Sequence, residues 1–121
     1  MKLHSWITVV AALPCALHAS STLAQGYPAK PVRILVGFAP GGGTDIMARA
    51  VGAKMTESVK QPFIIENRPG ANANVAAKLA AEAPADGYTI LFMSVAHIMS
   101  KPVYKNLGYD PFKSFEHVSL I

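Results

Sequence analysis

Three short apolar runs rich in β-branched and aromatic residues alternate with two segments of helical character. The apolar runs are residues 32–38 (VRILVGF), 63–66 (FIIE) and 88–93 (YTILFM). Such runs, bounded by Gly, Pro or Asn, are typical of buried strands. Residues 44–59 and 75–83 lie between the runs and predict helices. The order strand–helix–strand–helix–strand requires parallel strands joined by right-handed crossovers, and it therefore predicts an α/β layered sheet.

The first helical segment carries an apolar residue at every fourth position. This recurrence consists of Met47, Val51, Met55 and Val59. A stripe with this spacing predicts an amphipathic helix whose apolar face it forms. Thr44 and Asp45 stand at the start of the helix, where they are expected to cap it. The second helical segment is largely alanine, so that it is expected to lie close to the sheet, with Asn74 as its cap.

A further apolar run at residues 117–121 (HVSLI) predicts another strand. A strand that is apolar on both faces needs neighbours on both sides, and three or four strands supply few of them. We therefore expect this chain to be the beginning of a larger protein.

The first 24 residues have the organisation of a secretory signal peptide. Lys2 gives a positive start, residues 6–17 form an uncharged apolar run, and Thr22 and Ala24 occupy the positions that a signal peptidase prefers. A helix of this run is about 18 Å long, which is too short for a hydrocarbon core of roughly 30 Å. We therefore expect residues 1–24 to be cleaved, and the product to be soluble and exported, without stable membrane insertion.

Composition narrows the function classes once this leader is set aside. The chain has 121 residues, 51% hydrophobic and 15% charged, with 11 Lys and Arg against 7 Asp and Glu. This length allows one domain at most. The single Cys and the single Trp lie in the leader, which excludes disulfides and Cys-based zinc sites from the remainder. The basic residues are spaced singly, without the basic runs and interleaved aromatics of a nucleic-acid surface.

The chemistry is expected at three loops, because ligands of parallel α/β sheets bind at the carboxyl ends of the strands. These loops are residues 39–45, 68–74 and 94–97. The first contains three successive glycines, residues 41–43, which expose backbone N–H groups directly before a helix. The N-terminus of a helix attracts negative charge. The pattern favours a carboxylate or a phosphate; a flexible turn without a ligand is the alternative.

The second loop repeats this arrangement, with a Gly–Ala pair at residues 70–71 before a helix start. Two helix N-termini at one crevice would hold a dicarboxylate, with one carboxylate at each loop. Asn72 and Asn74 either donate to the ligand or cap the helix, and Ser94 either donates its hydroxyl or takes part in a plain turn. Asp45 either stabilises the first helical turn or faces a ligand ammonium group or a bridging water.

Nucleotide sites fit the sequence less well. A P-loop requires a lysine where Gly43 stands. A dinucleotide fingerprint that starts at Gly41 needs a glycine where Ile46 stands, although Glu66 lies where a ribose-binding acid belongs. A dinucleotide-dependent oxidoreductase that uses residues 41–43 and Glu66 is therefore kept as the alternative function.

Neither metal nor catalytic chemistry is expected. His97 and His117 have no nearby carboxylate pattern and are expected at the surface. No G-x-S-x-G or H-E-x-x-H motif and no nucleophile–base pair can be assembled. The sequence therefore predicts a binding protein without a cofactor rather than an enzyme.

Several motifs, in order and with matching spacing, resemble the Bug-type receptors, which are the extracytoplasmic substrate-binding proteins of tripartite tricarboxylate transporters. The motifs are YPAKPVR (27–33), VGFAPGGGTD (36–45), QP (61–62), ENRPGA (66–71), APADGYT (83–89), and YDP (109–111) followed by Phe115. The resemblance covers essentially all of residues 26–121, so chance does not account for it.

The resemblance implies the fold of a type II periplasmic binding protein, in which two α/β lobes close on a ligand by a hinge motion. It implies a periplasmic receptor, monomeric at full length, that passes a tricarboxylate, dicarboxylate or related organic acid to the membrane subunits of the transporter. Family members hold such ligands with backbone amides and helix ends rather than with arginine side chains. Carried over by position, the contacts in the first lobe are Phe38, Gly41, Gly42, Gly43, Thr44, Asp45, Ala71, Asn72, Ala73, Asn74 and Ser94.

The chain departs from the family pattern in three places. Asn72 and Ala73 stand where family members often have glycine, so the N–H groups of the second loop are expected to be less accessible and the ligand to differ. Where many family members have an Asn before a short helix that ends in Tyr, this chain has SKPVY at residues 100–104. Family chains are also considerably longer. We therefore expect residues 25–104 to form an incomplete first lobe and residues 105–121 to begin the crossover to a second lobe.

Overall fold

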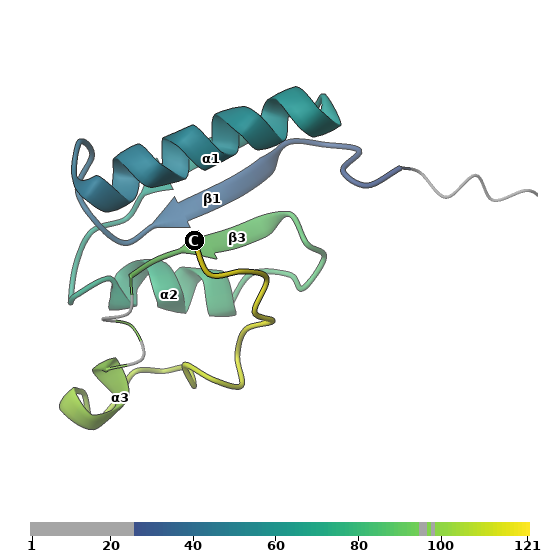
Figure 1. Ribbon diagram of the computed structural model, residues 1–121. Helices are drawn as coiled ribbons and strands as arrows, with labels where there is room; N and C mark the ends of the chain where they lie inside the picture. Colours follow the sequence, from purple (N-terminus) through teal and green to yellow (C-terminus); the bar gives the residue numbers. More distant parts are fainter. Residues whose placement is uncertain (1–25, 95–96, 98) are drawn as a thin grey trace, which may run out of the picture.

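The computed structural model describes residues 26–94, residue 97 and residues 99–121, and the signal peptide expected at residues 1–24 lies outside these ranges. Strands and helices alternate along the described chain, and a short helix follows the last strand (Figure 1). In chain order they are β1 (Val32–Val36), α1 (Gly43–Val59), β2 (Phe63–Asn67), α2 (Asn74–Ala81), β3 (Thr89–Phe92) and α3 (Ser100–Val103). No helix within the described ranges is long and apolar enough to cross a membrane.

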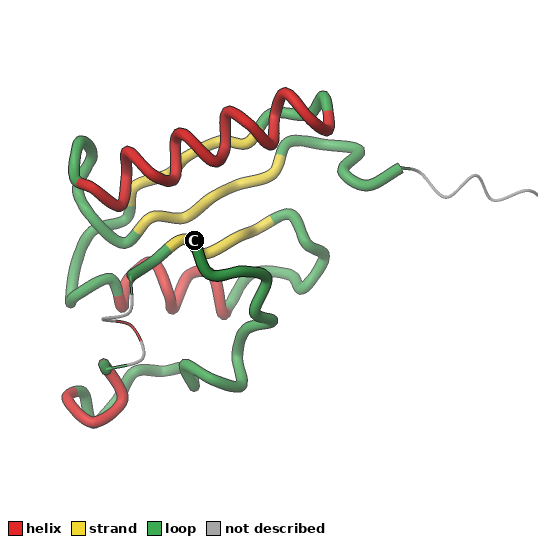
Figure 2. The backbone as a smooth tube through the Cα atoms, viewed as in Figure 1, coloured by secondary structure: helices red, strands yellow, loops and turns green. Residues whose placement is uncertain are grey.

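The strands form one parallel sheet in the order β2–β1–β3, with Ile34 paired to Ile65 on one side and to Ile90 on the other. The crossovers from β1 to β2 and from β2 to β3 run in opposite directions across the sheet. Right-handed crossovers then place their helices on opposite faces. Figures 1 and 2 show α1 on one face of the sheet and α2 on the other. The predicted α/β layered sheet is confirmed.

The central strand β1 is buried on both faces, which explains its continuous apolar sequence. Its fully buried residues are Val32, Ile34, Leu35 and Val36. Ile34 and Val36 pack with Ala48 of α1 on one face. Ala76 and Ala77 of α2, the helix on the opposite face, are also fully buried. The alanine-rich second helix therefore lies close to the sheet, as its sequence predicts.

The buried face of α1 is not the apolar stripe predicted from the sequence. Ala48 and Gly52 are buried, whereas Met47 is 47% and Val59 is 38% exposed. A Cβ atom placed on Gly52 would lie 3.1 Å from Cδ1 of Ile65. The helix thus lies close to bulky strand side chains that already fill the interior, and its own contact residues must be small.

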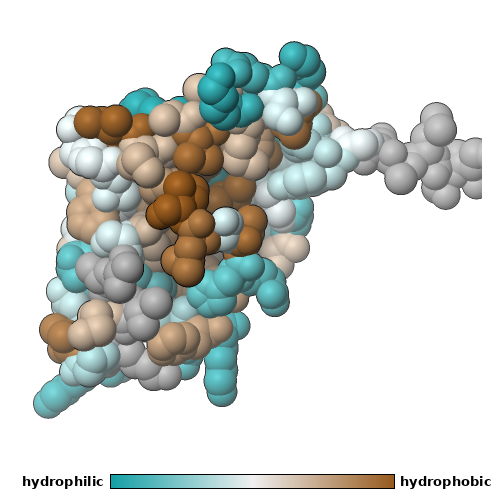
Figure 3. All heavy atoms as spheres, viewed as in Figure 1, coloured by the Kyte–Doolittle hydropathy of each residue, from teal (hydrophilic) through white to brown (hydrophobic). Residues whose placement is uncertain are grey.

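Residues 117–121 do not form the strand that their sequence predicts. The segment is exposed throughout, with Leu120 at 96%. A strand is stable only when neighbouring strands supply backbone hydrogen bonds and packing, and no strand among the described residues pairs with this segment. Figure 3 shows that the face viewed in Figure 1 carries a broad apolar area.

The arm before β1 is fixed to the turn before β3, at the amino ends of the strands. The hydroxyl of Tyr27 donates to the carbonyl of Gly87 (2.5 Å), and the Tyr27 ring lies edge-on to Tyr88, with 5.2 Å between centroids. Lys30 pairs with Asp86 (3.3 Å) and lies 4.3 Å from the centre of the Tyr88 ring. These contacts anchor the sheet at the edge opposite the loops where ligand chemistry is expected.

Candidate functional site

The first loop leaves β1 at its carboxyl end and leads into α1. Residues 41–43 are exposed, and Phe38 and Thr44 are partly buried. The N-cap is Gly42, and no side chain caps the helix, so the predicted capping by Thr44 and Asp45 is wrong. No backbone acceptor among the described residues serves the first N–H groups of α1, as is usual for a first turn. These donors, at the positive end of a long helix, can receive an anion.

The carboxylate of Asp45 shapes this loop from inside. Asp45 is 2% exposed, and its Oδ2 accepts hydrogen bonds from the backbone N–H of Gly41 (2.9 Å) and from Nε of Arg49 (2.9 Å). The hydrogen bonds from Arg49 first, then from Gly41 and Asn67, hold the pKa of Asp45 well below its usual range. The buried charge is tolerated because these donors satisfy it. The Asp45 carboxylate thus stabilises the glycine turn that leads into α1, rather than capping the first helical turn.

Asn67, the last residue of β2, joins the second strand to the first loop and was not predicted from the sequence. Its Nδ2 donates to Oδ1 of Asp45 (2.9 Å) and to the carbonyl of Phe38 (3.0 Å). Its Oδ1 accepts from Nη2 of Arg49 (3.1 Å). A side-chain amide suits this position because it both donates and accepts. The feature of the sequence that could have indicated this role is the position of Asn67 at the carboxyl end of a strand that neighbours β1.

The second loop has four successive residues with positive φ. These are Gly70 (139°), Ala71 (45°), Asn72 (55°) and Ala73 (70°). The left-handed conformation costs a residue with a side chain about 1–2 kcal/mol, so the surrounding structure must balance the strain of three such residues. Ala73 is the N-cap of α2 and no side chain caps this helix. The predicted capping by Asn74 is therefore wrong, because Asn74 is the first helical residue and its side chain is engaged elsewhere.

The two loops meet at their bases. A Cβ atom placed on Gly37, directly before Phe38, would lie 2.7 Å from Cα of Ala73 and closer still to its Cβ. Non-bonded carbon atoms do not approach so closely, so only glycine fits at position 37. Ala73 is itself buried. The structure thus places the start of the first loop against the end of the second, as expected of neighbouring parallel strands.

A partly buried polar cluster next to the second loop was also not predicted. The hydroxyl of Tyr109 donates to Oδ1 of Asn74 (2.6 Å) and lies 3.2 Å from Nδ1 of His97. The rings of His97 and Tyr109 are stacked with 5.4 Å between centroids, and Phe115 packs edge-on against both. Burial is the main cause that lowers the pKa of His97, and it raises the pKa of Tyr109. Both shifts favour the neutral form of the side chain.

The prediction that both histidines lie at the surface is wrong for His97, which is 6% exposed, and confirmed for His117, which is exposed. His97 is buried because Tyr109 and Phe115, distant in the sequence, pack on its ring. Only the YDP motif and the Phe that follows it mark these partners in the sequence.

Ser94, the predicted contact of the third loop, follows β3 and is exposed. Since β3 runs parallel to β1 and beside it, Ser94 lies at the same edge of the sheet as the first two loops. Its carbonyl accepts from the backbone N–H of His97 (3.2 Å). Within the described ranges its side chain makes no hydrogen bond to the first or second loop.

Glu66 is engaged by two arginines. Nε and Nη2 of Arg33 donate to its two carboxylate oxygens (2.7 and 3.0 Å), and Nη2 of Arg68 donates as well (3.2 Å). These bonds, chiefly those from Arg33, lower the pKa of Glu66. A carboxylate held in this way is not free to receive a ribose. Among the described residues, no group of three or more His, Cys, Asp or Glu side chains could hold a metal ion.

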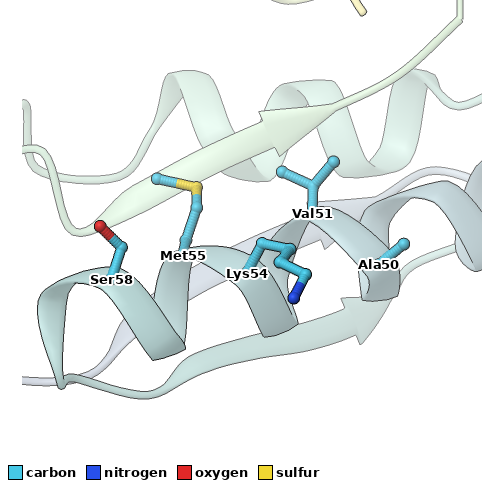
Figure 4. Close-up of a pocket in the computed structure, with 5 residues that line it drawn as sticks. All are labelled: Ala50, Val51, Lys54, Met55 and Ser58. Atoms are coloured by element: carbon cyan, nitrogen blue, oxygen red, sulfur yellow. The ribbon is translucent and has the colours of Figure 1, made fainter.

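Two surface depressions lie outside the first loop. One of about 430 Å³ on α1 is lined by apolar stripe residues, Val51 and Met55, together with Lys54 (Figure 4). The other, of about 250 Å³, is lined by Ala71 and Asn74 of the second loop and by residues of α2 and the segment after α3. The first is an open strip of helix surface, and only the second touches a predicted site residue.

Related sequences align with most of the chain. A family profile described as "Tripartite tricarboxylate transporter family receptor" matches residues 47–121. A UPF0065 protein of Bordetella pertussis (strain Tohama I) is 42% identical over 110 residues, which is 90% of this chain and 34% of the relative. The chain thus spans about a third of the length of the curated relatives it matches.

Solved structures of similar proteins share this fold. The periplasmic binding protein BugD matches with a TM-score of 0.72 and 39% identity, over 74% of this chain and 30% of its own. MatC from Rhodopseudomonas palustris, solved with bound malate, matches with a TM-score of 0.67 and 35% identity, over 74% of this chain and 31% of its own. The fold expected from the motifs, part of a periplasmic-binding-protein α/β lobe, is confirmed.

Proposed function

Since the chain belongs to the family of tripartite tricarboxylate transporter receptors, we propose that its protein binds a small organic carboxylate in the periplasm and delivers it to the membrane subunits of such a transporter. The family and its solved relatives are solute-binding receptors, so the activity proposed is binding, without catalysis or a cofactor.

The observation that carries this proposal is the meeting of two helix-leading loops at one edge of the sheet. The first N–H groups of α1, which meet no backbone acceptor among the described residues, lie in one loop, and the left-handed turn before α2 lies in the other. The close approach of Gly37 to Ala73 keeps the bases of the two loops together. Two helix N-termini held in this way suit a ligand with two negative groups.

Backbone amides, rather than basic side chains, are the proposed recognition groups. Among the described residues, Arg49 is the basic side chain that contacts the first loop, and its guanidinium is bonded to Asp45 and Asn67. Asp45 in turn is satisfied by protein donors and leaves the first turn of α1 free for a ligand. A dicarboxylate is the favoured ligand class, and bound malate in MatC supports it.

Isothermal titration calorimetry of the purified gene product tests the proposal. The ligands are malate, citrate, a monocarboxylate, and the uncharged diamide of malate as the control. We expect saturable binding of at least one di- or tricarboxylate and none of the diamide. Failure to bind every acid would refute the proposed function, and binding of NAD(H) that is lost in Glu66→Ala would replace it with the oxidoreductase alternative.

A pair of variants at one position separates backbone from side-chain recognition. Gly43→Pro removes one N–H group at the first helical position, which accepts proline, and the extended conformation of Gly42 (φ −75°, ψ 165°) suits a residue before proline. Gly43→Ala keeps the N–H group and adds a Cβ atom with nothing within 4 Å. We expect Gly43→Pro to weaken carboxylate binding about 10- to 100-fold and Gly43→Ala to bind normally. Equal affinities would contradict recognition by this N–H group.

A further inference from the structure

The side chains of Asn74, His97, Tyr109 and Phe115, here the Tyr109 cluster, adjoin the strained part of the second loop; Asn74 and His97 are buried, and Tyr109 and Phe115 are partly buried. Asn74 directly follows Ala73, the last left-handed residue, and its backbone N–H donates to the carbonyl of Ala71 (3.2 Å). Asn74 is 8% exposed. It is therefore tied to the turn through its backbone and to Tyr109 through its side chain.

The hydrogen bonds of Tyr109 link the proton positions in the cluster to one another. A tyrosine hydroxyl has a single hydrogen, and at 2.6 Å it is donated to Oδ1 of Asn74. Towards Nδ1 of His97, at 3.2 Å, the same oxygen can only accept. With the Tyr109 hydroxyl donated to Asn74, a neutral His97 carries its hydrogen on Nδ1. Its Nε2 is left unprotonated, and this atom is buried without a hydrogen-bond partner among the described residues.

We propose that Tyr109 is a positioning residue for the second loop: through Asn74 it holds the left-handed turn of residues 71–73 against Gly37, in the conformation that receives the ligand. The part that concerns the ligand rests on the proposed function. No side chain caps α2, and three strained residues precede it, so the turn needs support from outside the loop. The bond between Tyr109 and Asn74, 35 residues apart in the chain, supplies such support.

Tyr109→Phe in the purified gene product tests this proposal, because it removes the hydroxyl and keeps the ring that stacks on His97. Tyr27→Phe is the matched control, since it removes a hydroxyl that donates to Gly87 at the opposite edge of the sheet. Imidazole ¹⁵N resonances report the tautomer of His97. Backbone amide resonances report the conformation of residues 71–74, and calorimetry reports the affinity for a carboxylate that the wild type binds.

We expect the Nδ1–H tautomer in the wild type and in Tyr27→Phe, and its replacement by the Nε2–H tautomer in Tyr109→Phe. The amides of residues 71–74 should shift in Tyr109→Phe alone, and carboxylate affinity should fall roughly 2- to 10-fold, as for the loss of one hydrogen bond. Asn74→Asp keeps an acceptor for Tyr109 and should retain the tautomer and the loop conformation, whereas Asn74→Leu should not.

Two results would overturn the inference: an Nε2–H tautomer in the wild type, or amide positions and affinity in Tyr109→Phe that match those of Tyr27→Phe. These outcomes are separate from a failure of the proposed function. If the wild type binds no carboxylate, the function fails, and the tautomer and the amide resonances still decide the role of Tyr109.

Discussion

Substitution of Gly37 by alanine tests the contact that joins the two loops. The added Cβ atom would lie 2.7 Å from Cα of Ala73, whereas non-bonded carbon atoms are at least about 3.5 Å apart, so the loops must separate by roughly 0.8 Å or more. Overpacking of this kind costs about 1–3 kcal/mol. The lower entropy of alanine in the unfolded chain offsets about 0.4–1 kcal/mol of this cost. We therefore expect a net loss of about 1–2 kcal/mol in the free energy of unfolding.

Urea unfolding followed by circular dichroism measures this loss, and Gly43→Ala is the matched control from the same segment. A Cβ atom at Gly43 meets no atom within 4 Å, so the free energy of unfolding should stay within about 0.5 kcal/mol of the wild type. Carboxylate affinity should fall in Gly37→Ala because the bases of the loops are pushed apart. Equal stability of the two variants, together with unchanged affinity, would refute the described contact.

Three further outcomes follow from the packing and the charges. Asn67→Ala should weaken carboxylate binding about tenfold in calorimetry, because it frees the Phe38 carbonyl and removes a donor from Asp45; unchanged affinity would show that Asn67 does not position the first loop. The free energy of unfolding should fall as the pH drops below 6.5, by at most about 1.4 kcal/mol per pH unit. The reason is that the pKa of His97 is lowered on folding, so the unfolded chain binds the proton more readily; a slope that persists in His97→Gln would assign it to another group. Ala48→Leu should destabilise the fold by about 1–3 kcal/mol, whereas Met47→Gln, on the exposed face of α1, should change it by less than about 0.5 kcal/mol; the reverse order would restore the apolar stripe as the packed face.

The strands and the ligand-facing loops could be predicted because their signals are local. An apolar run such as that of β1, followed by glycines and a helical pattern, marks both the strand and the loop after it. The packed face of α1 could not be predicted from hydropathy. Close approach to the sheet selects small residues such as Ala48 and Gly52, and these carry little apolar signal. The strand expected at residues 117–121 does not form, because strand formation depends on neighbouring strands as well as on composition.

The supporting contacts of the site depend on residues that are distant in the sequence. Asn67 supports the first loop from a neighbouring strand, and Tyr109 supports the second loop across 35 positions. Neither side chain is unusual in type, so nothing local marks its role. The burial of His97 has the same origin, because its aromatic neighbours are brought to it by the fold. The sequence patterns thus predicted which loops face the ligand, and the structure shows which side chains hold those loops in position.

The proposed function requires that backbone amides of the two joined loops receive a carboxylate. An amide ¹H–¹⁵N titration of the labelled gene product with malate tests it most directly. We expect the amides of residues 41–45 and 71–74 to shift and saturate together, at one malate concentration, while the diamide of malate shifts neither set. Shifts confined to exposed lysines, or to only one of the two loops, would contradict it.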